Sequence, residues 1–496
     1  MRIIASVLVS LVSVCLWADI CFIGFTDKHG TTGSLDHPEE YLSAKALARR
    51  QSQNIVTDSL DLPVSELYID SLRRMGYKVR YTTKWLNGVV AEAPAGGNIL
   101  DMMSISFIRT MQYTRRNDIL PPPYSKRMTV NKTDIGLITT SADRYAAQYT
   151  TMLRLDSLFR LGFYGQGKTI AVVDNGFLNV NTADAFTHTR PHILGTYDIV
   201  ELSDNVYSTG FHGAAVLSLI SGARGDTLLG TAPESDFYLF HTEDDDSESM
   251  LEVDNMVRAF ELADSLGADI ITASLGYYVF NDESTSFTYA DMNGKTARCS
   301  LAATVAANKG ILVFIAAGNE GNKEWHYIDA PADAEDILTV GGVDINREHS
   351  TFSSYGPTAD GRVKPDICAM ATNVPYYYPD AFYASSGTSF ATPIMAGAAA
   401  TLWSAMPQLT AREIRQKLIH SADRYLTPDS AYGYGIPDLV AAYYDTPSAI
   451  EYAMPAEAET IAIYDISGHY MGTQSAILPR GIYIVKRGNN TTKIVK

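Results

Sequence analysis

Cysteine is scarce in this chain, with four among 496 residues. So few cysteines in so long a chain do not make the disulfide scaffold that stabilises small secreted domains. If the first eighteen residues are removed, Cys21, Cys299 and Cys368 remain, which is an odd number. A bridge between Cys299 and Cys368 is compatible with an oxidising compartment, but the spacing alone does not establish it.

Positive charge is also in deficit. Lysine and arginine together number 39 against 56 aspartates and glutamates, which gives a formal net charge of −17. This balance argues against nucleic acid as a partner and suits a soluble exported protein. The length of 496 residues predicts more than one domain.

Long apolar runs are missing beyond the amino end. The charged start Met1-Arg2 precedes an apolar stretch at 3–14, and the small residue Ala18 follows. This pattern is typical of a secretory signal peptide, and the run is too short to span a bilayer. We therefore expect a signal peptide at 1–18. Cys15 leaves a lipoprotein anchor open, although the bulky valine before it disfavours lipidation.

The most informative segment runs from Ser385 to Pro393 and places Ser389 between a glycine turn and an alanine-rich apolar helix. The start of a helix presents unpaired N–H groups and a partial positive charge, which help to hold an oxyanion beside an attacking serine. Ser389 is therefore a candidate nucleophile. The alternative is an ordinary serine cap of the helix.

Two further segments offer partners for this serine. The apolar run at 168–174 predicts a buried parallel strand that ends in Asp174, at the edge of an open α/β sheet where ligands gather. His212 lies near the start of a helix of small residues at 210–222. Taken alone, Asp174 is equally well interpreted as a turn or cap residue. His212 taken alone is better interpreted as a structural histidine.

A third segment leads from a predicted buried strand at 311–317 into Gly318-Asn319. A side-chain amide in this position can donate to a developing oxyanion, and removing one such donor typically costs about two to three powers of ten in turnover. In isolation, Gly-Asn is more often a turn.

In this chain order, the Asp174, His212, Asn319 and Ser389 blocks resemble those of the subtilases, the subtilisin-like serine peptidases. The resemblance runs from about Tyr164 to about Tyr444. It also covers four intervening segments, at 230–233, 273–276, 339–343 and 352–357.

The resemblance implies an α/β fold for residues 144–446, with a subtilisin-like parallel sheet flanked by helices. It implies that Ser389 attacks the peptide carbonyl while His212 accepts its proton and Asp174 orients His212. Asn319 and the backbone N–H of Ser389 would hold the oxyanion. The resemblance therefore implies a serine endopeptidase that acts on protein or peptide substrates and requires no cofactor.

Substrate binding is expected along Ser274, Leu275 and Gly276, which resemble the extended edge that pairs with the substrate main chain. Two departures from the family pattern stand in the histidine helix, at Ala214 and at Leu217-Ser218. Neither transfers the catalytic proton, so we expect an active peptidase. The alternative is a catalytically silent surface protein that uses the fold to bind peptides or glycans.

The segment at 19–120 has a pattern of its own. Strands are expected at 21–26, 79–85, 88–92 and 107–113, and helices at 38–50, at 63–75 and near Ile99. Apart from the helix at 38–50, this is the β-α-β-β-α-β order of a ferredoxin-like α+β domain. Its place resembles that of a subtilase propeptide, which assists folding and inhibits temporarily. A permanent accessory domain is the alternative.

Residues 121–143 form the predicted linker between these domains. Three prolines at 121–123 make its start rigid, and a polar stretch follows. Processing of a precursor is expected here, although the sequence does not specify the bond.

Acidic residues cluster at Asp244-Asp245-Asp246, with Glu243 and Glu248 on either side. Hard cations bind several oxygen ligands, which makes calcium a candidate. The run lacks the glycine and the spacing of a calcium loop, so we expect a solvated acidic loop near the substrate cleft. The resemblance allows structural calcium, but no motif identifies metal ligands.

The carboxyl end, 447–496, is predicted to hold short strands divided by glycine turns, at 460–465, 478–486 and 492–496. It resembles a short version of the sorting domains of type IX secretion cargo in Gram-negative bacteria. The resemblance implies contact with export machinery and a secreted or cell-surface location. A plain β-rich accessory tail is the alternative.

Overall fold

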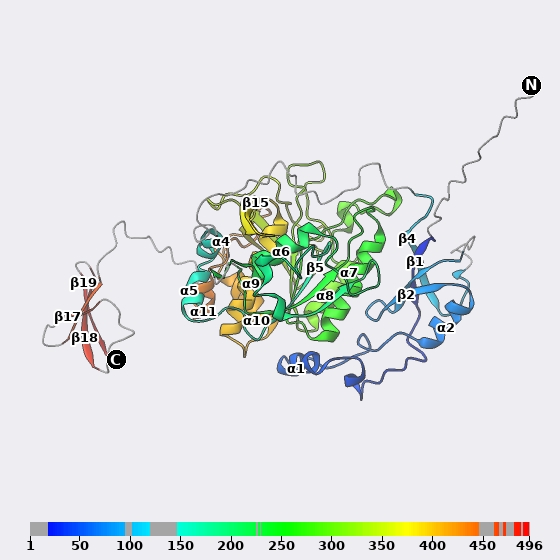
Figure 1. The fold of residues 1–496 in the computed structure, drawn as a ribbon, viewed down its shortest axis with the longest axis horizontal. Helices are drawn as coiled ribbons and strands as arrows, with labels where there is room; N and C mark the ends of the chain where they lie inside the picture. The colour runs from blue at the N-terminus through cyan, green and yellow to red at the C-terminus, as the bar shows by residue number, and fades with distance from the viewer. Residues whose placement is uncertain are drawn as a thin grey trace, which may run out of the picture. The chain divides into compact units, whose positions relative to one another are not determined.

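The computed structural model describes residues 18–94, 102–119, 146–224, 227–228, 230–445, 461–465, 470–472, 481–487 and 490–495. The linker at 121–143, the helix near Ile99 and all but the last residue of the signal peptide fall outside these ranges. The chain divides into two compact units, Met1–Ala449 and Ile450–Lys496, and each is described by itself (Figure 1).

A parallel sheet of seven strands forms the centre of the first unit, in the order β13-β12-β11-β10-β5-β9-β6. Its strands are β5 (Thr169–Asp174), β6 (Ile193–Asp198), β9 (Asp236–His241), β10 (Ile270–Ala273), β11 (Leu312–Ala316), β12 (Leu338–Val343) and β13 (Ile367–Met370). Strands buried on both faces are nearly continuous apolar runs, as the sequence showed for β5 and β11. The sheet confirms the predicted α/β class.

Helices cover both faces of this sheet. Ile170 and Val172 of β5 belong to the core shared with α6 (Phe211–Ser221) and α9 (Thr388–Ala405). The alternate residues Ala171 and Val173 belong to the core shared with α7 (Met250–Leu266) and α8 (Arg298–Asn308). Successive side chains of a strand point to opposite faces, so one strand serves both cores.

Shorter elements complete the first unit after the amino-terminal domain. The helices are α4 (Ala146–Met152), α5 (Leu155–Arg160), α10 (Ala411–His420) and α11 (Leu439–Tyr444), with 3₁₀ turns η3 (Asp184–Phe186), η4 (Arg190–His192), η5 (Glu283–Thr285) and η6 (Tyr289–Asp291). Two hairpins are formed by β7 (Ala223–Arg224) with β8 (Thr227–Leu228) and by β14 (Val374–Tyr377) with β15 (Phe382–Ser385). Within the described residues, no helix combines the length and the apolarity that a membrane span requires.

The described part of the amino-terminal domain has the strands and the first helices of the predicted ferredoxin-like order, while the predicted helix near Ile99 lies outside the described residues. Its elements are β1 (Ile20–Phe25), η1 (Pro38–Glu40), α1 (Ala44–Ser52), α2 (Glu66–Arg74), β2 (Lys78–Thr83), β3 (Gly88–Glu92) and β4 (Ile108–Arg115). The strands pair antiparallel in the order β2-β3-β1-β4. Both α-helices start later than predicted, because Ser43 and Ser65 act as N-caps and accept hydrogen bonds from Ala46 and Tyr68.

The sheet of this domain packs against α7 and α8 (Figure 1). Phe22, Tyr81 and Val90 belong to the same buried cluster as the apolar side of α7. Around the apolar contact, Tyr81 donates to Asn255 Oδ1 at 2.6 Å. Glu261 accepts from the Thr83 hydroxyl at 2.6 Å, so the charged end of a buried side chain is hydrogen-bonded across the interface.

A second contact is made by residues 43–62, which we call the arm. Arg50 is almost completely buried and bonds Asp264 of α7 at 2.8 Å and Asp61 of the arm at 2.9 Å. Arg49 also contacts Asp264, at 2.6 Å, and Lys309 contacts Asp61 at 2.9 Å. Because each buried charge has an opposite partner, the arm and the α/β domain share one ion network.

The arm also makes hydrogen bonds to backbone groups of the α/β domain. Gln53 donates to the carbonyl of Gly310 at 2.8 Å and accepts from the N–H of Ala411, the first residue of α10, at 3.0 Å. Ser43 N–H donates to the carbonyl of Ser265 at 2.9 Å. The arm therefore holds the ends of α7 and α8 and the start of α10.

Acid is expected to weaken this interface. Burial alone would raise the pKa of Asp264, but the positive charges of Lys84, Arg49 and Arg50 outweigh burial and lower it. Burial would also raise the pKa of Asp61, but hydrogen bonds from Arg50 and Lys309 lower it. A carboxyl whose pKa is lowered by folding stabilises the folded state fully at pH values above its ordinary pKa of 3.8. This stabilisation is lost as the pH falls from 3.8 through the lowered pKa of the folded state.

We therefore expect the urea midpoint of the full-length chain, measured by circular dichroism, to be lower at pH 3 than at pH 6. The Asp61→Asn variant has lost one of the two groups, so its midpoint should change less over the same range. An equal change in both proteins would contradict this assignment.

Three cysteines lie among the described residues, and each is a buried free thiol. Cys299 of α8 and Cys368 of β13 belong to cores on opposite faces of the sheet, so the bridge left open by the sequence is not formed. Burial raises the pKa of Cys21 to about 12, and its thiol donates to the carbonyl of Ala91. These thiols pack as small apolar groups.

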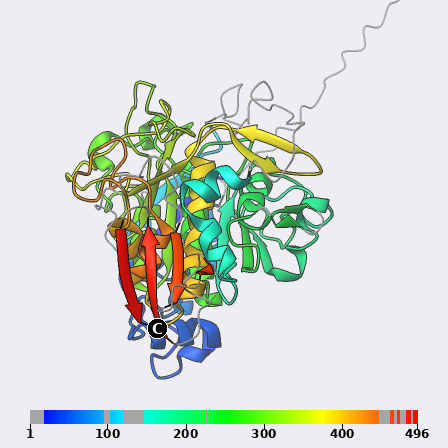
Figure 2. The same ribbon diagram turned by 90° about the vertical axis from the view of Figure 1, so that its left-hand side faces the viewer.

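The second unit is a four-stranded antiparallel sheet, shown in red in Figure 2. It contains β16 (Ile461–Asp465), β17 (Tyr470–Gly472), β18 (Ile482–Arg487) and β19 (Asn490–Val495), in the order β17-β16-β18-β19. Ile463, Tyr483 and Val485 form its small core. The predicted β-rich tail is confirmed.

Candidate active site

The five segments singled out from the sequence meet at one edge of the sheet. Asp174 is the last residue of β5, while Ser274 and Asn319 follow the neighbouring strands β10 and β11. His212 is the second residue of α6 and Ser389 the second of α9. Parallel strands end together, so residues far apart in the sequence are gathered at the carboxyl edge.

Asp174 and His212 form a buried hydrogen-bonded pair. His212 Nδ1 lies 2.7 Å from Asp174 Oδ1, and the backbone N–H of Asn175 donates to the same oxygen at 2.9 Å. Asp174 is fully buried and His212 nearly so. An ionised carboxylate only accepts hydrogen bonds, so Nδ1 carries the proton and Nε2 is left as the basic nitrogen.

Gly213 allows the histidine helix to approach the aspartate strand. A Cβ at this position would lie 2.1 Å from the carbonyl oxygen of Gly176 and 2.9 Å from Cβ of Asp174, which is closer than real contacts allow. The departures at Ala214 and Leu217 are buried in the apolar core, and Ser218 donates to the carbonyl of Ala215 within the helix.

Ser389 is held by a reciprocal pair of bonds with Ser274. The Ser389 hydroxyl donates to the carbonyl of Ser274 at 3.2 Å, and the Ser274 hydroxyl donates to the carbonyl of Ser389 at 2.9 Å. Proline has no N–H, so Pro393 cannot donate to the carbonyl four residues earlier, which is that of Ser389. Ser274 supplies the donor that the proline removes.

The Ser389 hydroxyl makes no hydrogen bond to His212 among the residues that the structure describes, because its proton goes to Ser274. The His212 ring packs edge-on against Phe390, next to the serine, with ring centroids 5.9 Å apart. Catalytic hydrogen bonds are often long before substrate binds and tighten in the complex.

Asn319 is oriented by the residue before the serine. Its Oδ1 accepts from the backbone N–H of Thr388 at 2.9 Å and from the Thr388 hydroxyl at 3.2 Å. With the oxygen occupied in this way, the amide N–H₂ is the end left to donate. Asn319 lines the same pocket as Ser389, which fits donation to an oxyanion formed at the serine.

Removal of this donor gives the first activity prediction. Asn319→Ala is expected to lower kcat by about 100- to 1,000-fold and to leave KM nearly unchanged, because the bond forms only with the oxyanion. Initial rates on a peptide substrate measure both constants. A rise in KM with unchanged kcat would place Asn319 in ground-state binding instead.

A pocket of about 180 Å³ adjoins Ser389. It is lined by Glu243, Glu248, Ser274, Leu275, Gly276, Tyr278, Ala316, Gly318, Asn319, Glu320, Asp329, Thr388 and Ser389. The three residues expected to bind substrate therefore lie in one pocket with the serine and the asparagine.

The lining of this pocket is acidic. It includes four carboxyl side chains and neither lysine nor arginine. Burial raises the pKa of Glu243 to about 8, although its carboxyl accepts a hydrogen bond from the Tyr277 hydroxyl at 2.6 Å. Glu320 contacts Lys323 at 2.9 Å, and this partner balances part of its charge.

Asp329 lies against both glycine walls of the pocket. A Cβ at Gly318 would lie 2.5 Å from Asp329 Oδ2, and one at Gly276 would lie 2.9 Å from Asp329 Cβ. The antiparallel bridge between Tyr277 and Ala330 brings these segments together. Asp329 gives no signal in the sequence, because it lies outside the strands and only the fold brings it into the same pocket as Ser389.

The acidic run at 244–246 is held by contacts around the site. Asp244 contacts Arg115 at the end of β4 at 3.4 Å. Asp245 accepts from the Asn175 side chain at 3.5 Å and from the Thr209 hydroxyl at 3.4 Å. The run therefore lies between the amino-terminal domain and the loop that follows Asp174.

Two family models match the chain. The model described as the subtilase family, Peptidase S8, matches residues 165–435. The model described as the Peptidase S8 propeptide domain of Bacteroidota matches residues 20–131. Together they cover the α/β domain and the ferredoxin-like domain before it.

Individual proteins are similar over the same region. The thermostable alkaline protease of Halalkalibacterium halodurans is 31% identical over 277 residues, 55% of this chain and 67% of that protein. Subtilisin DY of Bacillus licheniformis is 28% identical over 298 residues, 59% of this chain and 96% of the relative. The crystal structure of MycP1 from Mycobacterium smegmatis aligns with a TM-score of 0.50 at 22% identity, covering 62% of this chain and 87% of that one, and supports the fold alone.

Proposed function

Because the chain belongs to the subtilase family of serine endopeptidases, we propose that it hydrolyses peptide bonds through an acyl-enzyme on Ser389. The observation that carries the proposal is the buried Asp174–His212 hydrogen bond, 2.7 Å long, at the sheet edge where Ser389 opens α9. A protein that only bound peptides would need no such pair.

In the proposed reaction, His212 Nε2 takes the proton of Ser389 as Oγ attacks the substrate carbonyl. Asp174 stabilises the imidazolium that results. Asn319 and the Ser389 N–H bind the oxyanion until the C–N bond breaks and His212 returns the proton to the leaving amine. Water then repeats the sequence on the acyl group, which frees Ser389.

The propeptide domain makes the chain a precursor, and we propose that this domain inhibits the enzyme until it is cut. Arg115 and Arg116 at the end of β4 contact Asp244 and Asp282 of the α/β domain, at 3.4 and 4.0 Å. Asp244 is next to the pocket residue Glu243. The chain that leaves the propeptide thus starts beside the pocket, which favours a cut within 121–143.

The acidic pocket supports a substrate preference for a lysine or arginine side chain beside the scissile bond. A cationic side chain that enters the pocket faces the carboxyls of Asp329, Glu248 and Glu320. Charges of opposite sign about 4 Å apart near a protein surface attract by roughly 4 kcal/mol before desolvation is subtracted, so part of this energy remains for selectivity.

Asp329→Asn tests the preference. The ratio of kcat/KM for an arginine peptide to that for the matching alanine peptide should fall by about 10- to 100-fold, equivalent to roughly 1.4–2.8 kcal/mol. Asp282→Asn changes a carboxyl outside the pocket lining and serves as the control. An unchanged ratio in Asp329→Asn would exclude Asp329 as a selectivity residue while leaving the hydrolysis itself untouched.

Export is the third part of the proposal. The signal-like start at 1–18 and the sorting-type tail at 447–496 support secretion to the medium or the surface of a Gram-negative bacterium through type IX machinery; a lipid anchor at Cys15 is the less favoured route. Deletion of 447–496 should then retain the protein inside the cell envelope, as fractionation and immunoblotting would show. Secretion of the truncated protein would contradict the sorting role.

A fluorophosphonate probe tests the catalytic assignment directly, because it reacts only with a serine activated by its neighbours. We expect the processed enzyme to be labelled at Ser389 and the Ser389→Ala protein to stay unlabelled. A folded, processed wild type that resists labelling would favour the catalytically silent surface protein.

A further inference from the structure

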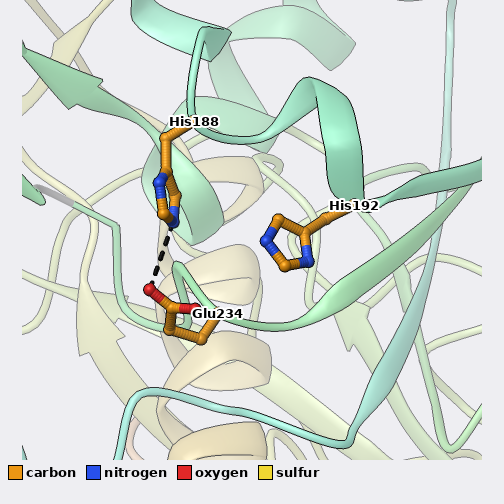
Figure 3. Close-up of side chains that lie close together, drawn as sticks. All are labelled: His188, His192 and Glu234. Carbon is orange, nitrogen blue, oxygen red and sulfur yellow. Dashed lines mark ion pairs between the residues drawn. The ribbon is translucent and has the colours of Figure 1, made fainter.

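Two histidines and a glutamate converge on the side of the sheet remote from the active site (Figure 3). His188 lies in the turn between η3 and η4, His192 ends η4, and Glu234 stands two residues before β9. β9 ends at the carboxyl edge of the sheet, so the segment before it lies at the opposite edge. Nothing in the peptidase reaction uses these residues.

The ligand atoms of this group point to a common centre. They all lie within 4.8 Å of one another, and His188 Nε2 is 3.2 Å from Glu234 Oε1. His188 Nε2 is buried, and its contact with Glu234 is an ion pair that does not meet the geometry of a hydrogen bond (Figure 3). A metal ion bound between these two atoms would take both as ligands.

A further carboxylate holds the second histidine. His192 Nδ1 lies 3.1 Å from Asp236 Oδ1, so this nitrogen is engaged and the other ring nitrogen, Nε2, faces His188 and Glu234 (Figure 3). Histidine ligands of metals typically donate their second ring N–H to a carboxylate, which fixes the tautomer and strengthens the ligand. Asp236 supplies this contact.

We propose that His188, His192 and Glu234 bind a zinc ion, with Asp236 as the positioning residue for His192. Two imidazoles and one carboxylate suit zinc, whereas calcium binds oxygen ligands. Ligands of a tetrahedral zinc ion are about 3.3 Å apart, since the bonds are about 2.0–2.1 Å long. The His188–Glu234 pair has this spacing. All three ligand atoms lie within 4.8 Å of one another, so the partly exposed His192 ring reaches this spacing by a shift of at most about 1.5 Å.

The carboxylates near the two histidines would neutralise the two positive charges of a zinc ion. Glu234 and Asp236 carry two negative charges, and the cation on the same short helix, Arg190, is engaged elsewhere. Its guanidinium donates to the carbonyl of Ala183 at 2.8 Å and to the Thr187 hydroxyl at 3.1 Å. Water would complete the coordination, because the three side chains are each partly exposed.

The expected effect of the metal is on stability. The ion joins the turn before β6 to the segment before β9, and β6 is an edge strand that pairs only with β9 in this sheet. A ligand that binds only the folded state raises stability by mass action. Zinc should therefore protect this edge against unfolding and against cleavage by other copies of the enzyme.

The test uses the Ser389→Ala precursor, which is freed of metals by EDTA and dialysis. Calorimetric titration with zinc chloride should show one site, with a Kd of about 10 µM or below, and zinc should raise the Tm. The single variants His188→Ala and His192→Ala should each weaken zinc binding at least tenfold. Asp236→Asn should weaken zinc binding about 10- to 100-fold. His37→Ala, at an exposed histidine paired with Glu39, is the matched control and should bind like the parent.

Two results would overturn the proposal. One is the absence of a heat of binding at zinc concentrations up to about 100 µM. The other is full binding by a His188→Ala, His192→Ala double variant, which would place any zinc elsewhere in the protein. A Tm for this double variant without metal that matches the parent shows that it folds. Calcium chloride in place of zinc should give no effect that these substitutions abolish.

Discussion

Ser389→Ala is expected to lower kcat by about a million-fold and to leave the precursor uncut. Loss of the serine removes covalent catalysis altogether, and this magnitude is the one known for triads of the subtilisin type. Residual hydrolysis above the water rate should persist, because Asn319 and the substrate contacts remain. Rates are measured on a peptide substrate, and self-processing is followed on gels over time.

The double variant distinguishes a triad from two independent groups. His212→Ala alone should cost nearly as much as Ser389→Ala, and the double variant should lose little more, because either change disables the same proton transfer. Ser218→Ala, in the same helix as His212 but away from the site, is the matched control and should retain turnover. Additive losses in the double variant would refute the shared role.

The second large effect is on folding. Arg50→Ala is expected to destabilise the precursor by about 3 kcal/mol, because a buried arginine is removed from two buried carboxylates. The lower end of the usual range applies, since Asp264 keeps Arg49 and Asp61 keeps Lys309. Urea unfolding in the Ser389→Ala background measures the change without interference from self-cleavage.

Arg73→Ala is the matched control for this measurement. Arg73 pairs with Asp70 at 3.0 Å, but both side chains are more than half exposed. Exposed pairs of this kind contribute roughly 0–1 kcal/mol. Similar midpoints for Arg50→Ala and Arg73→Ala would mean that the buried network carries no particular share of the stability.

The positions of the candidate catalytic residues could be predicted from the sequence because each stands at the end of a short, regular element. Asp174 and Asn319 follow short apolar runs bounded by glycine, which favour buried strands, and Ser389 follows a glycine turn into an alanine-rich helix. Local patterns of this kind specify both the element and its end, and a parallel sheet then brings the ends together.

The place of Asp329 in the pocket and the contacts of the arm could not be predicted in the same way. Asp329 lies in an irregular segment and reaches Gly276 and Gly318 only through long-range packing. Arg50 and Asp264 look in the sequence like ordinary charged surface residues of their helices, and the sequence does not show that the two helices meet. Side chains whose role depends on a distant partner leave no periodic signal.

The contacts of the arm are non-covalent, so they need not restrain the fold permanently. The arm bonds to residues 264, 310 and 411, which are far apart in the sequence. A disulfide could restrain such segments instead, but the described cysteines are free thiols. A covalent bridge would persist for the life of the enzyme. If the amino-terminal domain is cut off as proposed, the ion pairs and amide hydrogen bonds of the arm leave with it. The protein would then fold with a restraint that the mature enzyme no longer carries.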